Sequence, residues 1–418
     1  MVATGAADEV DLRGRVEARW RPLADELAAV AARDDVVGAA LCVYEGDRCV
    51  VDVAAGWTDL ERTRPRRLDD RHVVFSAVKG VVSGLVACLV ADGVLDLDAP
   101  VTELWPEFGA HGKARLSVAD VLAHRAGVPA VDRPLTLAEV LDVEALADAL
   151  AAQRPLWPPG RAHGYHAFTW GALVSRLVTR ATGRPLPDEL RSRVTDPLGV
   201  PFSIGEPPVG DGGGEVVPLV AAPTAPAATA AAFAAARATR ALGWRAMTMD
   251  GTFDDPDGYG VVAEWPEVRR AVLPASGGVS DARSLARVYA ALVSPVDGVR
   301  LADHPAMSAA TRVRSSGFDL CLVRPSAFGA GFARRSASFP LPFPTSFGHT
   351  GVGGVVAFGD PRTGVCAAYV PSRVTVDVST DPNWRRLARV LRRVVLGGRP
   401  RPRVPLVRPR EATGRPRP

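Results

Sequence analysis

Residues 73–80 read VVFSAVKG, and the apolar stretch around Ser76 and Lys79 decides how the rest of the chain is interpreted. From residue 76 to residue 91 nearly every position is apolar, and an Asp-Gly pair ends the run. This pattern predicts a buried helix with Ser76 in its first turn. Side chains three residues apart share one face of a helix, so we expect the Lys79 amine within hydrogen-bond reach of the Ser76 hydroxyl.

Lysine is rare in this chain. Of 50 basic residues only Lys79 and Lys113 are lysine, and all the others are arginine. Arginine keeps its proton because its pKa stays above about 12, so a side chain that must lose a proton has to be lysine. Burial among the neighbouring valines would favour the neutral amine that a general base requires. The pair predicts a serine nucleophile activated by lysine, although the spacing alone is equally typical of a helix-capping serine followed by a salt-bridged lysine.

Two further segments favour the first interpretation. Residues 158–167 read PPGRAHGYHA and place Tyr165 between a Pro/Gly loop and a predicted helix, while residues 347–354 read FGHTGVGG at the start of a predicted strand. With SAVK at residues 76–79, their order resembles the serine β-lactamase and penicillin-binding-protein superfamily, in which Ser-x-x-Lys, Tyr-x-Asn and Lys-Thr-Gly line one cleft. The resemblance covers roughly residues 12–396 and is strongest to class C β-lactamases and family VIII carboxylesterases. The segments LDLDAPVTELWPEFGAHGK and LSVADVLAHRAGVP also fit the esterase-like branch.

The resemblance implies a role for each matching residue. Ser76 would be the acylated nucleophile and Lys79 its base or proton partner. Tyr165 would be a second base that relays a proton to the leaving group and later activates water. Because a phenol ordinarily ionises near pH 10, we expect a Lys79 cation to help Tyr165 ionise. The backbone N–H groups of Ser76 and Val352 would hold the oxyanion. The remaining expected substrate contacts are His349, Thr350, Gly351 and His166.

The sequence departs from the superfamily pattern at two positions. Ala167 replaces the asparagine of Tyr-x-Asn, and His349 replaces the lysine of Lys-Thr-Gly. Histidine is mostly uncharged at neutral pH and holds a substrate carboxylate weakly, so both changes point away from penicillins and D-Ala-D-Ala peptides. We therefore predict a serine hydrolase that cleaves uncharged carboxylic esters through an acyl-enzyme, without a metal or cofactor. His163 and His166 have a His-x-x-His spacing, but no third ligand accompanies them, and no metal site is predicted.

Other functions remain open at this point. The same residues would serve an acyltransferase, a weak β-lactamase or a D-amino-acid peptidase. The missing asparagine and an unusual Gly/Pro/Ala-rich stretch at residues 201–228 also fit a non-catalytic relative that keeps the cleft as a binding module. The chain has no Gly-x-Ser-x-Gly and no His-Glu-x-x-His, which argues against an α/β-hydrolase and a metallopeptidase.

Strand patterns occur near both ends of the chain, and helical patterns fill the middle. Residues 36–43 and 48–53 read as a hairpin that follows a predicted helix over residues 16–31. Strands are also predicted at 354–358 and 365–370, before a closing helix over 383–396. This order predicts an α+β fold of the β-lactamase-like type, with an antiparallel sheet flanked by helices and an inserted, mostly helical lobe.

The expected domains follow from that order: a discontinuous sheet lobe (12–75 and 276–396), a helical lobe (76–275) and a tail (397–418). The tail holds seven arginines and one glutamate, so the formal charge of +4 leaves −2 for residues 1–396. Its Pro/Arg composition predicts disorder. Because the body is not basic, we expect no nucleic-acid partner. The resemblance implies a small-molecule ester as the partner.

Composition places the chain among ordinary globular proteins. Hydrophobic residues make up 47% and charged residues 23% of its 418 positions, which is enough apolar material for a large core. Five cysteines without CxxC spacing suggest reduced thiols rather than a disulfide framework. No apolar run reaches the roughly 18 residues of a membrane span, and no secretory signal is visible, so a cytoplasmic location is expected.

Overall fold

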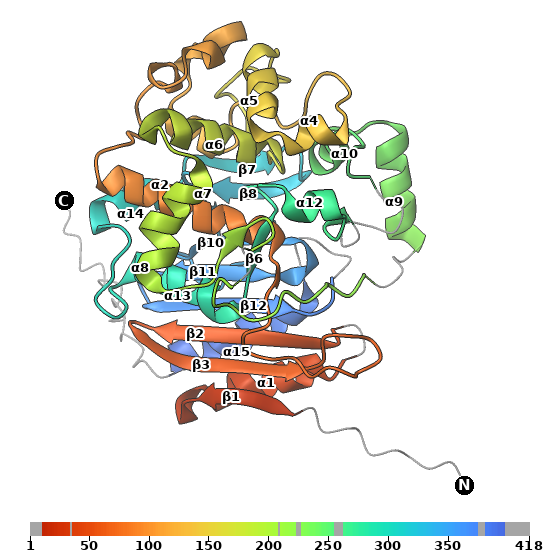
Figure 1. Ribbon diagram of the computed structural model, residues 1–418, viewed down its shortest axis with the longest axis vertical. Coiled ribbons are helices and arrows are strands. Elements are labelled where there is room, and N and C mark those ends of the chain that lie inside the picture. The colour runs from red at the N-terminus through yellow and green to blue at the C-terminus, as the bar shows by residue number, and fades with distance from the viewer. Residues whose placement is uncertain are drawn as a thin grey trace, which may run out of the picture.

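A long antiparallel sheet joins segments from both ends of the chain (Figure 1). The computed structural model describes residues 11–33, 36–207, 210–222, 227–254, 262–374 and 381–397. Within these ranges the sheet has nine strands in the order β1-β3-β2-β12-β11-β10-β9-β8-β7. Their bounds are Leu12–Val16 (β1), Gly38–Glu45 (β2), Arg48–Gly56 (β3), Ser315–Asp319 (β7), Arg324–Phe328 (β8), Ala333–Arg334 (β9), Phe347–Thr350 (β10), Val356–Asp360 (β11) and Val365–Pro371 (β12).

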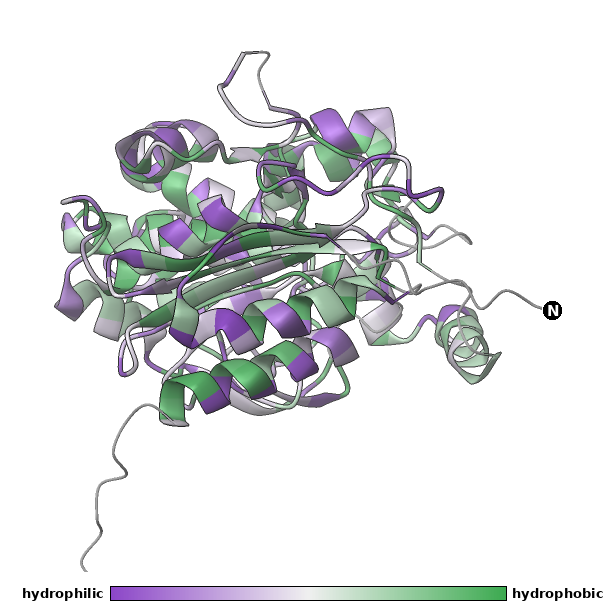
Figure 2. Ribbon diagram, turned by 90° about the horizontal axis from the view of Figure 1, so that it is seen from below, coloured by the Kyte–Doolittle hydropathy of each residue, from purple (hydrophilic) through white to green (hydrophobic). Residues whose placement is uncertain are grey.

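The two chain ends meet where β2 pairs with β12, with Leu41 opposite Tyr369. Alternate residues of these strands face opposite sides of the sheet, because side chains alternate along a strand. Leu41 and Tyr369 belong to the core cluster that holds α1 (Arg21–Ala31) and α15 (Pro382–Gly397). Figure 2 shows these two helices side by side across one face of the sheet. The other face packs against α13 (Ala282–Val293) and α2 (Val78–Ala91).

The middle of the chain is mostly helical, and in Figure 1 α4, α5 and α6 lie at the opposite end of the molecule from β1. A second, small sheet has the order β4-β6-β5, with bounds His72–Val73 (β4), Gly278–Ser280 (β6) and Ser203–Ile204 (β5). Its strand β4 leads into the turn that carries Ser76. The remaining α-helices are α3 (Val118–Leu122), α4 (Leu137–Leu141), α5 (Val143–Ala152), α6 (Thr169–Thr182), α7 (Leu186–Leu190), α8 (Asp196–Leu198), α9 (Ala227–Ala238), α10 (Leu242–Thr248), α12 (Pro266–Arg270) and α14 (His304–Thr311). Short 3-10 or π segments are η1 (Ala18–Trp20), η2 (Phe75–Ala77), η3 (Val101–Glu103), η4 (Pro106–Arg115), η5 (Arg191–Thr195) and η6 (Val352–Gly354).

The predicted α+β architecture, the hairpin and the closing helix are confirmed. The predicted helix over residues 16–31 is wrong at its start, because Val16 is the last residue of β1 and pairs with Val51. The helix begins at Arg21, with Pro22 in its first turn, where proline is tolerated; a proline inside a longer helix would break it. The proposed domain boundaries stay a prediction, and residues 398–418 of the predicted tail lie outside the described ranges. None of the described helices is both long and apolar enough to cross a membrane.

Candidate active site

Ser76 lies on a sharp turn between β4 and α2. The residue before it, Phe75, has φ +47°, a conformation that L-residues adopt rarely. The turn is held to the small sheet by a 2.8 Å hydrogen bond from the Val74 N–H to the Gly278 carbonyl. Ser76 is the second residue of η2, and the N–H groups at the start of a helix have no carbonyl partner within it. The turn therefore presents a partly exposed hydroxyl together with backbone N–H groups at the start of a helix.

Lys79 is fully buried one turn further along. Its Nζ lies 3.1 Å from Ser76 Oγ and 2.7 Å from each of the carbonyl oxygens of Ala167 and Ala275. Burial alone lowers the pKa of Lys79 well below its usual value, because the charged form loses its hydration. A neutral amine has two N–H bonds and one lone pair. In that form, donation of both N–H bonds to the two carbonyls would leave the lone pair for the Ser76 hydroxyl.

Tyr165 completes this group of side chains. Lys79 Nζ lies 5.0 Å from the centre of its ring, and the phenol is hydrogen-bonded with the Ser76 side chain. Burial raises the pKa of Tyr165 above its usual value, so the phenol keeps its proton at neutral pH. This contradicts the expectation that a Lys79 cation helps Tyr165 ionise, since both groups are driven toward their neutral forms.

The segment after β10 packs against the turn that carries Ser76. A Cβ atom at Gly351 would lie 2.3 Å from the Val74 carbonyl oxygen, so only glycine allows this approach. Val352 follows as the first residue of η6, and its side chain shares a small apolar cluster with Phe75. The N–H groups of Ser76 and Val352 thus belong to two short helical turns that lie against each other.

His349 is buried beside Tyr165, with ring centres 5.9 Å apart. Its Nδ1 lies 2.6 Å from the Thr350 carbonyl oxygen, which can only accept, so Nδ1 carries the proton. Burial is the main cause that lowers the pKa of His349 to about 3. Within the described structure its Nε2 has no hydrogen-bond partner. The ring is therefore a neutral acceptor, and it offers no positive charge to a substrate carboxylate.

His166, expected to contact the substrate, is instead held by the backbone. Its Nε2 accepts a 3.1 Å hydrogen bond from the Val128 N–H, and its Nδ1 donates to the Gly164 carbonyl at 2.6 Å. The side chain is fully buried, so neither ring nitrogen is left for a substrate. Within the described ranges, no three His, Cys, Asp or Glu side chains are arranged to hold a metal ion.

Sequence reasoning missed Asp319, which holds the Tyr165 loop from β7. Its Oδ1 accepts the backbone N–H groups of Tyr165, Cys321 and Leu322, each at 2.9 Å. Its Oδ2 accepts the Ser326 hydroxyl at 2.8 Å. An isolated aspartate at a strand end is an ordinary turn residue, so no sequence signal marked it. The carbonyls of Ala167 and Ala275 were missed because backbone oxygens carry no sequence signal at all.

A small, mostly apolar cavity of about 40 Å³ lies beside these segments. Phe75, Phe168 and Ser276 line it, and each directly follows or precedes a residue of the Ser76–Lys79 hydrogen-bond network. Glu206 and Arg269 also line the cavity and pair with each other at 3.6 Å, which leaves no unpaired charge between them. The other lining residues are Val73, Pro207, Val216, Phe253, Val262, Ala263, Val268, Leu273, Gly277 and Val279.

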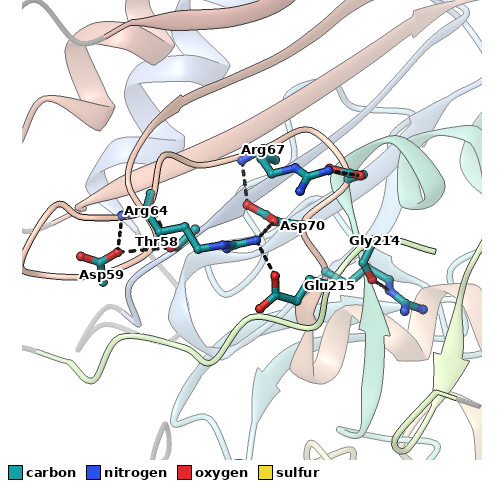
Figure 3. A network of polar contacts seen from close by, with 9 residues as sticks. Thr58, Asp59, Arg64, Arg67, Asp70, Gly214 and Glu215 are labelled. Carbon is teal, nitrogen blue, oxygen red and sulfur yellow. Dashed lines mark hydrogen bonds and ion pairs between the residues drawn. The ribbon is translucent and has the colours of Figure 1, made fainter. Parts of the chain in front are cut away.

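A polar network, shown in Figure 3, lies next to Val216, one of the residues that line the cavity. Arg64 Nη2 contacts Asp70 Oδ1 at 2.6 Å and Glu215 Oε2 at 3.1 Å. Arg71 Nε donates to the Gly214 carbonyl at 2.7 Å. These contacts hold the segment next to Val216 against the loop that leads into β4. Val216 is thereby tied to the element that positions Ser76.

Comparison with known proteins shows the family of this chain. The sequence pattern of the Beta-lactamase family matches residues 23–392. Esterase/beta-lactamase LipL from Mycobacterium tuberculosis (strain ATCC 25618 / H37Rv) is 34% identical over 346 residues, which cover 81% of this chain and 77% of LipL. Esterase EstB from Burkholderia gladioli is 32% identical over 183 residues, or 40% of this chain and 46% of EstB.

Solved structures are similar over nearly the whole chain. A family VIII carboxylesterase superposes with a TM-score of 0.81 at 27% identity and covers 92% of this chain and 100% of its own. A penicillin-binding protein homologue from Caulobacter crescentus gives a TM-score of 0.79 at 31% identity, with coverage of 91% and 100%. The superfamily resemblance seen in the sequence is therefore confirmed, and the chain belongs to the beta-lactamase family.

Proposed function

We propose that this chain is a serine hydrolase that cleaves uncharged carboxylic esters through an acyl-enzyme on Ser76. The observation that carries the proposal is the buried Lys79 amine, whose only described hydrogen-bond partners are Ser76 Oγ and two backbone carbonyls. A buried neutral amine beside a hydroxyl is a general base next to its nucleophile.

Each step of the reaction uses a group of this site. Lys79 takes the Ser76 proton as Oγ attacks the ester carbonyl carbon. The N–H groups of Ser76 and Val352 stabilise the negative charge on the carbonyl oxygen. Tyr165, which keeps its proton at neutral pH, gives it to the departing alkoxide, and the Lys79 ammonium restores it. Water then attacks the acyl-enzyme by the same steps in reverse order.

The surroundings favour an uncharged substrate. His349 is neutral and cannot pair with a carboxylate, and the adjoining cavity is mainly apolar. An apolar acyl group fits that cavity because its burial there releases water from apolar surface. The names of the relatives support this reaction class, since both LipL and EstB are described as esterases.

The wider proposal includes the partner, the location and the domains. The protein binds a small-molecule ester as its substrate and binds no nucleic acid, and it acts in the cytoplasm. The sheet lobe (12–75 and 276–396) and the helical lobe (76–275) meet at the site. All groups that the reaction needs come from the chain itself.

Substitution of the nucleophile tests the function. Ser76→Ala should lower kcat/KM for p-nitrophenyl butyrate by at least about 10⁴-fold, since removal of a serine nucleophile leaves only residual catalysis. Ser308→Ala, on the exposed surface of α14, is the matched control and should keep full activity. A fluorophosphonate should label Ser76 in the natural chain. Normal turnover by Ser76→Ala, or a natural chain that is neither labelled nor active, would refute the proposal.

A further inference from the structure

Two cysteines lie side by side on neighbouring strands, apart from the residues proposed for ester cleavage. Cys42 on β2 and Cys49 on β3 have their Sγ atoms 3.6 Å apart. Cys49 is the direct partner of Tyr44 across the hairpin, and Tyr44 and Cys42 point to the same face of β2. The two thiols are thus diagonal neighbours on one face of the sheet.

The two thiols have different surroundings. Cys49 is partly exposed, whereas Cys42 is fully buried. A hydrogen bond from the Cys42 thiol, and a further one from the Arg15 guanidinium on β1, lower the pKa of Cys49 to about 7. Burial and, to a smaller extent, Asp52 oppose this shift, and Asp52 is itself paired with Arg283 at 2.6 Å. Cys49 therefore combines access to solvent with thiolate character, the two properties of a reactive cysteine.

The other cysteines lack this combination. Cys88, Cys321 and Cys366 are buried, and burial raises the pKa of each thiol. Cys42 is also held in its thiol form, mainly by burial. An oxidant that reacts with thiolates should therefore reach Cys49 first, with Cys42 as the adjacent thiol.

We propose that Cys49 is a site of oxidation by hydroperoxides and that Cys42 is its resolving cysteine. The Cys49 sulfur attacks one peroxide oxygen, the O–O bond breaks, and the other oxygen leaves with a proton as water or an alcohol. Cys49 becomes a sulfenic acid. The Cys42 sulfur then forms the S–S bond, and the hydroxyl of the sulfenic acid leaves with the Cys42 proton as water. The two thiols together lose two electrons, which reduce the peroxide.

The hairpin can accommodate this bond with a local shift. The sulfurs must approach from 3.6 Å to the roughly 2 Å of a disulfide. The register of β2 and β3 shifts between Val43 and Tyr44, inside the segment that the new bond would close. A β-bulge interrupts the regular ladder, so the strand can adjust there without loss of the pairing on either side.

The test treats the full chain with hydrogen peroxide and follows each cysteine by mass spectrometry. The natural chain should lose two hydrogen atoms, and a peptide map should join residues 42 and 49. Cys42→Ser should instead gain one oxygen at Cys49, which dimedone should trap as the sulfenic acid. Cys49→Ser should show neither change, and Cys88→Ser should behave as the natural chain does.

Three results would overturn the proposal. These are oxidation that begins at Cys88, Cys321 or Cys366, a Cys49→Ser chain that still loses two hydrogen atoms, and a natural chain whose Cys49 resists peroxide while free glutathione in the same tube is oxidised. The peptide map of the natural chain decides the question even where a variant fails to fold. Ester hydrolysis takes no part in these readouts.

Discussion

At the scale of single residues, Lys79 shows what a sequence can and cannot reveal about a site. The rarity of lysine and the Ser-x-x-Lys spacing predicted its closeness to Ser76, and the structure gives 3.1 Å between the two side chains. The two carbonyls that orient the amine come from residues 88 and 196 positions away. Contacts of this kind depend on the tertiary fold, so no local pattern could have predicted them.

The pH dependence of the reaction should report the state of Lys79. Its pKa is lowered below 10.5 and the base must be unprotonated, so kcat/KM should rise with pH through a value well below 10.5. Lys79→Arg keeps a positive charge but supplies no base, and should lower kcat/KM by about 10²–10⁴-fold near neutral pH. A pH profile of kcat/KM with p-nitrophenyl butyrate, recorded for the natural chain and for Lys79→Arg, checks both expectations. Near-normal activity of Lys79→Arg would contradict the proton-transfer role.

At the scale of elements, the site depends on how a strand end holds a loop. The β7 strand ends in Asp319, whose carboxyl group accepts the N–H of Tyr165 from a loop more than 150 residues earlier. The sequence predicted the helix around Lys79 and the loop around Tyr165, but not this connection. Short strands such as β7 to β9 have weak sequence patterns, and their pairing is decided by the rest of the sheet.

Substitution of Asp319 should lower the stability of the protein. Asp319→Ala leaves three N–H groups without their acceptor, at about 1–3 kcal/mol for each buried group, so we expect the free energy of unfolding to fall by about 3 kcal/mol or more. Asp319→Asn keeps one oxygen for these groups and should lose less. Urea titration measures the stability, and kcat should fall with it because Tyr165 is displaced. Equal stability of Asp319→Ala and the natural chain would contradict the anchoring role.

At the scale of the whole molecule, the two ends of the chain build one core. The strand-forming segments near both chain ends, with the turn residues between them, predicted the hairpin and the last strands, and so the shared sheet. The predicted helix over residues 16–31 is wrong at Val16, where the pairing of β1 with β3 overrides a helical spacing. Helix α15 covers the face of the large sheet opposite the active site. Its residues Trp384, Leu387, Leu391 and Val395 are buried against elements from the N-terminal end of the chain.

Two truncations should therefore behave in opposite ways. A chain that ends at Asp381 lacks the four large apolar side chains that α15 buries, and loss of a large apolar side chain from a core costs about 2–5 kcal/mol. Their combined loss is comparable with the roughly 5–15 kcal/mol that stabilises a whole domain, so this chain should not fold. A chain that ends at Gly397 keeps α15 and should retain its melting temperature and ester hydrolysis. Thermal unfolding and butyrate turnover check both, and activity in the shorter chain would show that the sheet is stable without its C-terminal helix.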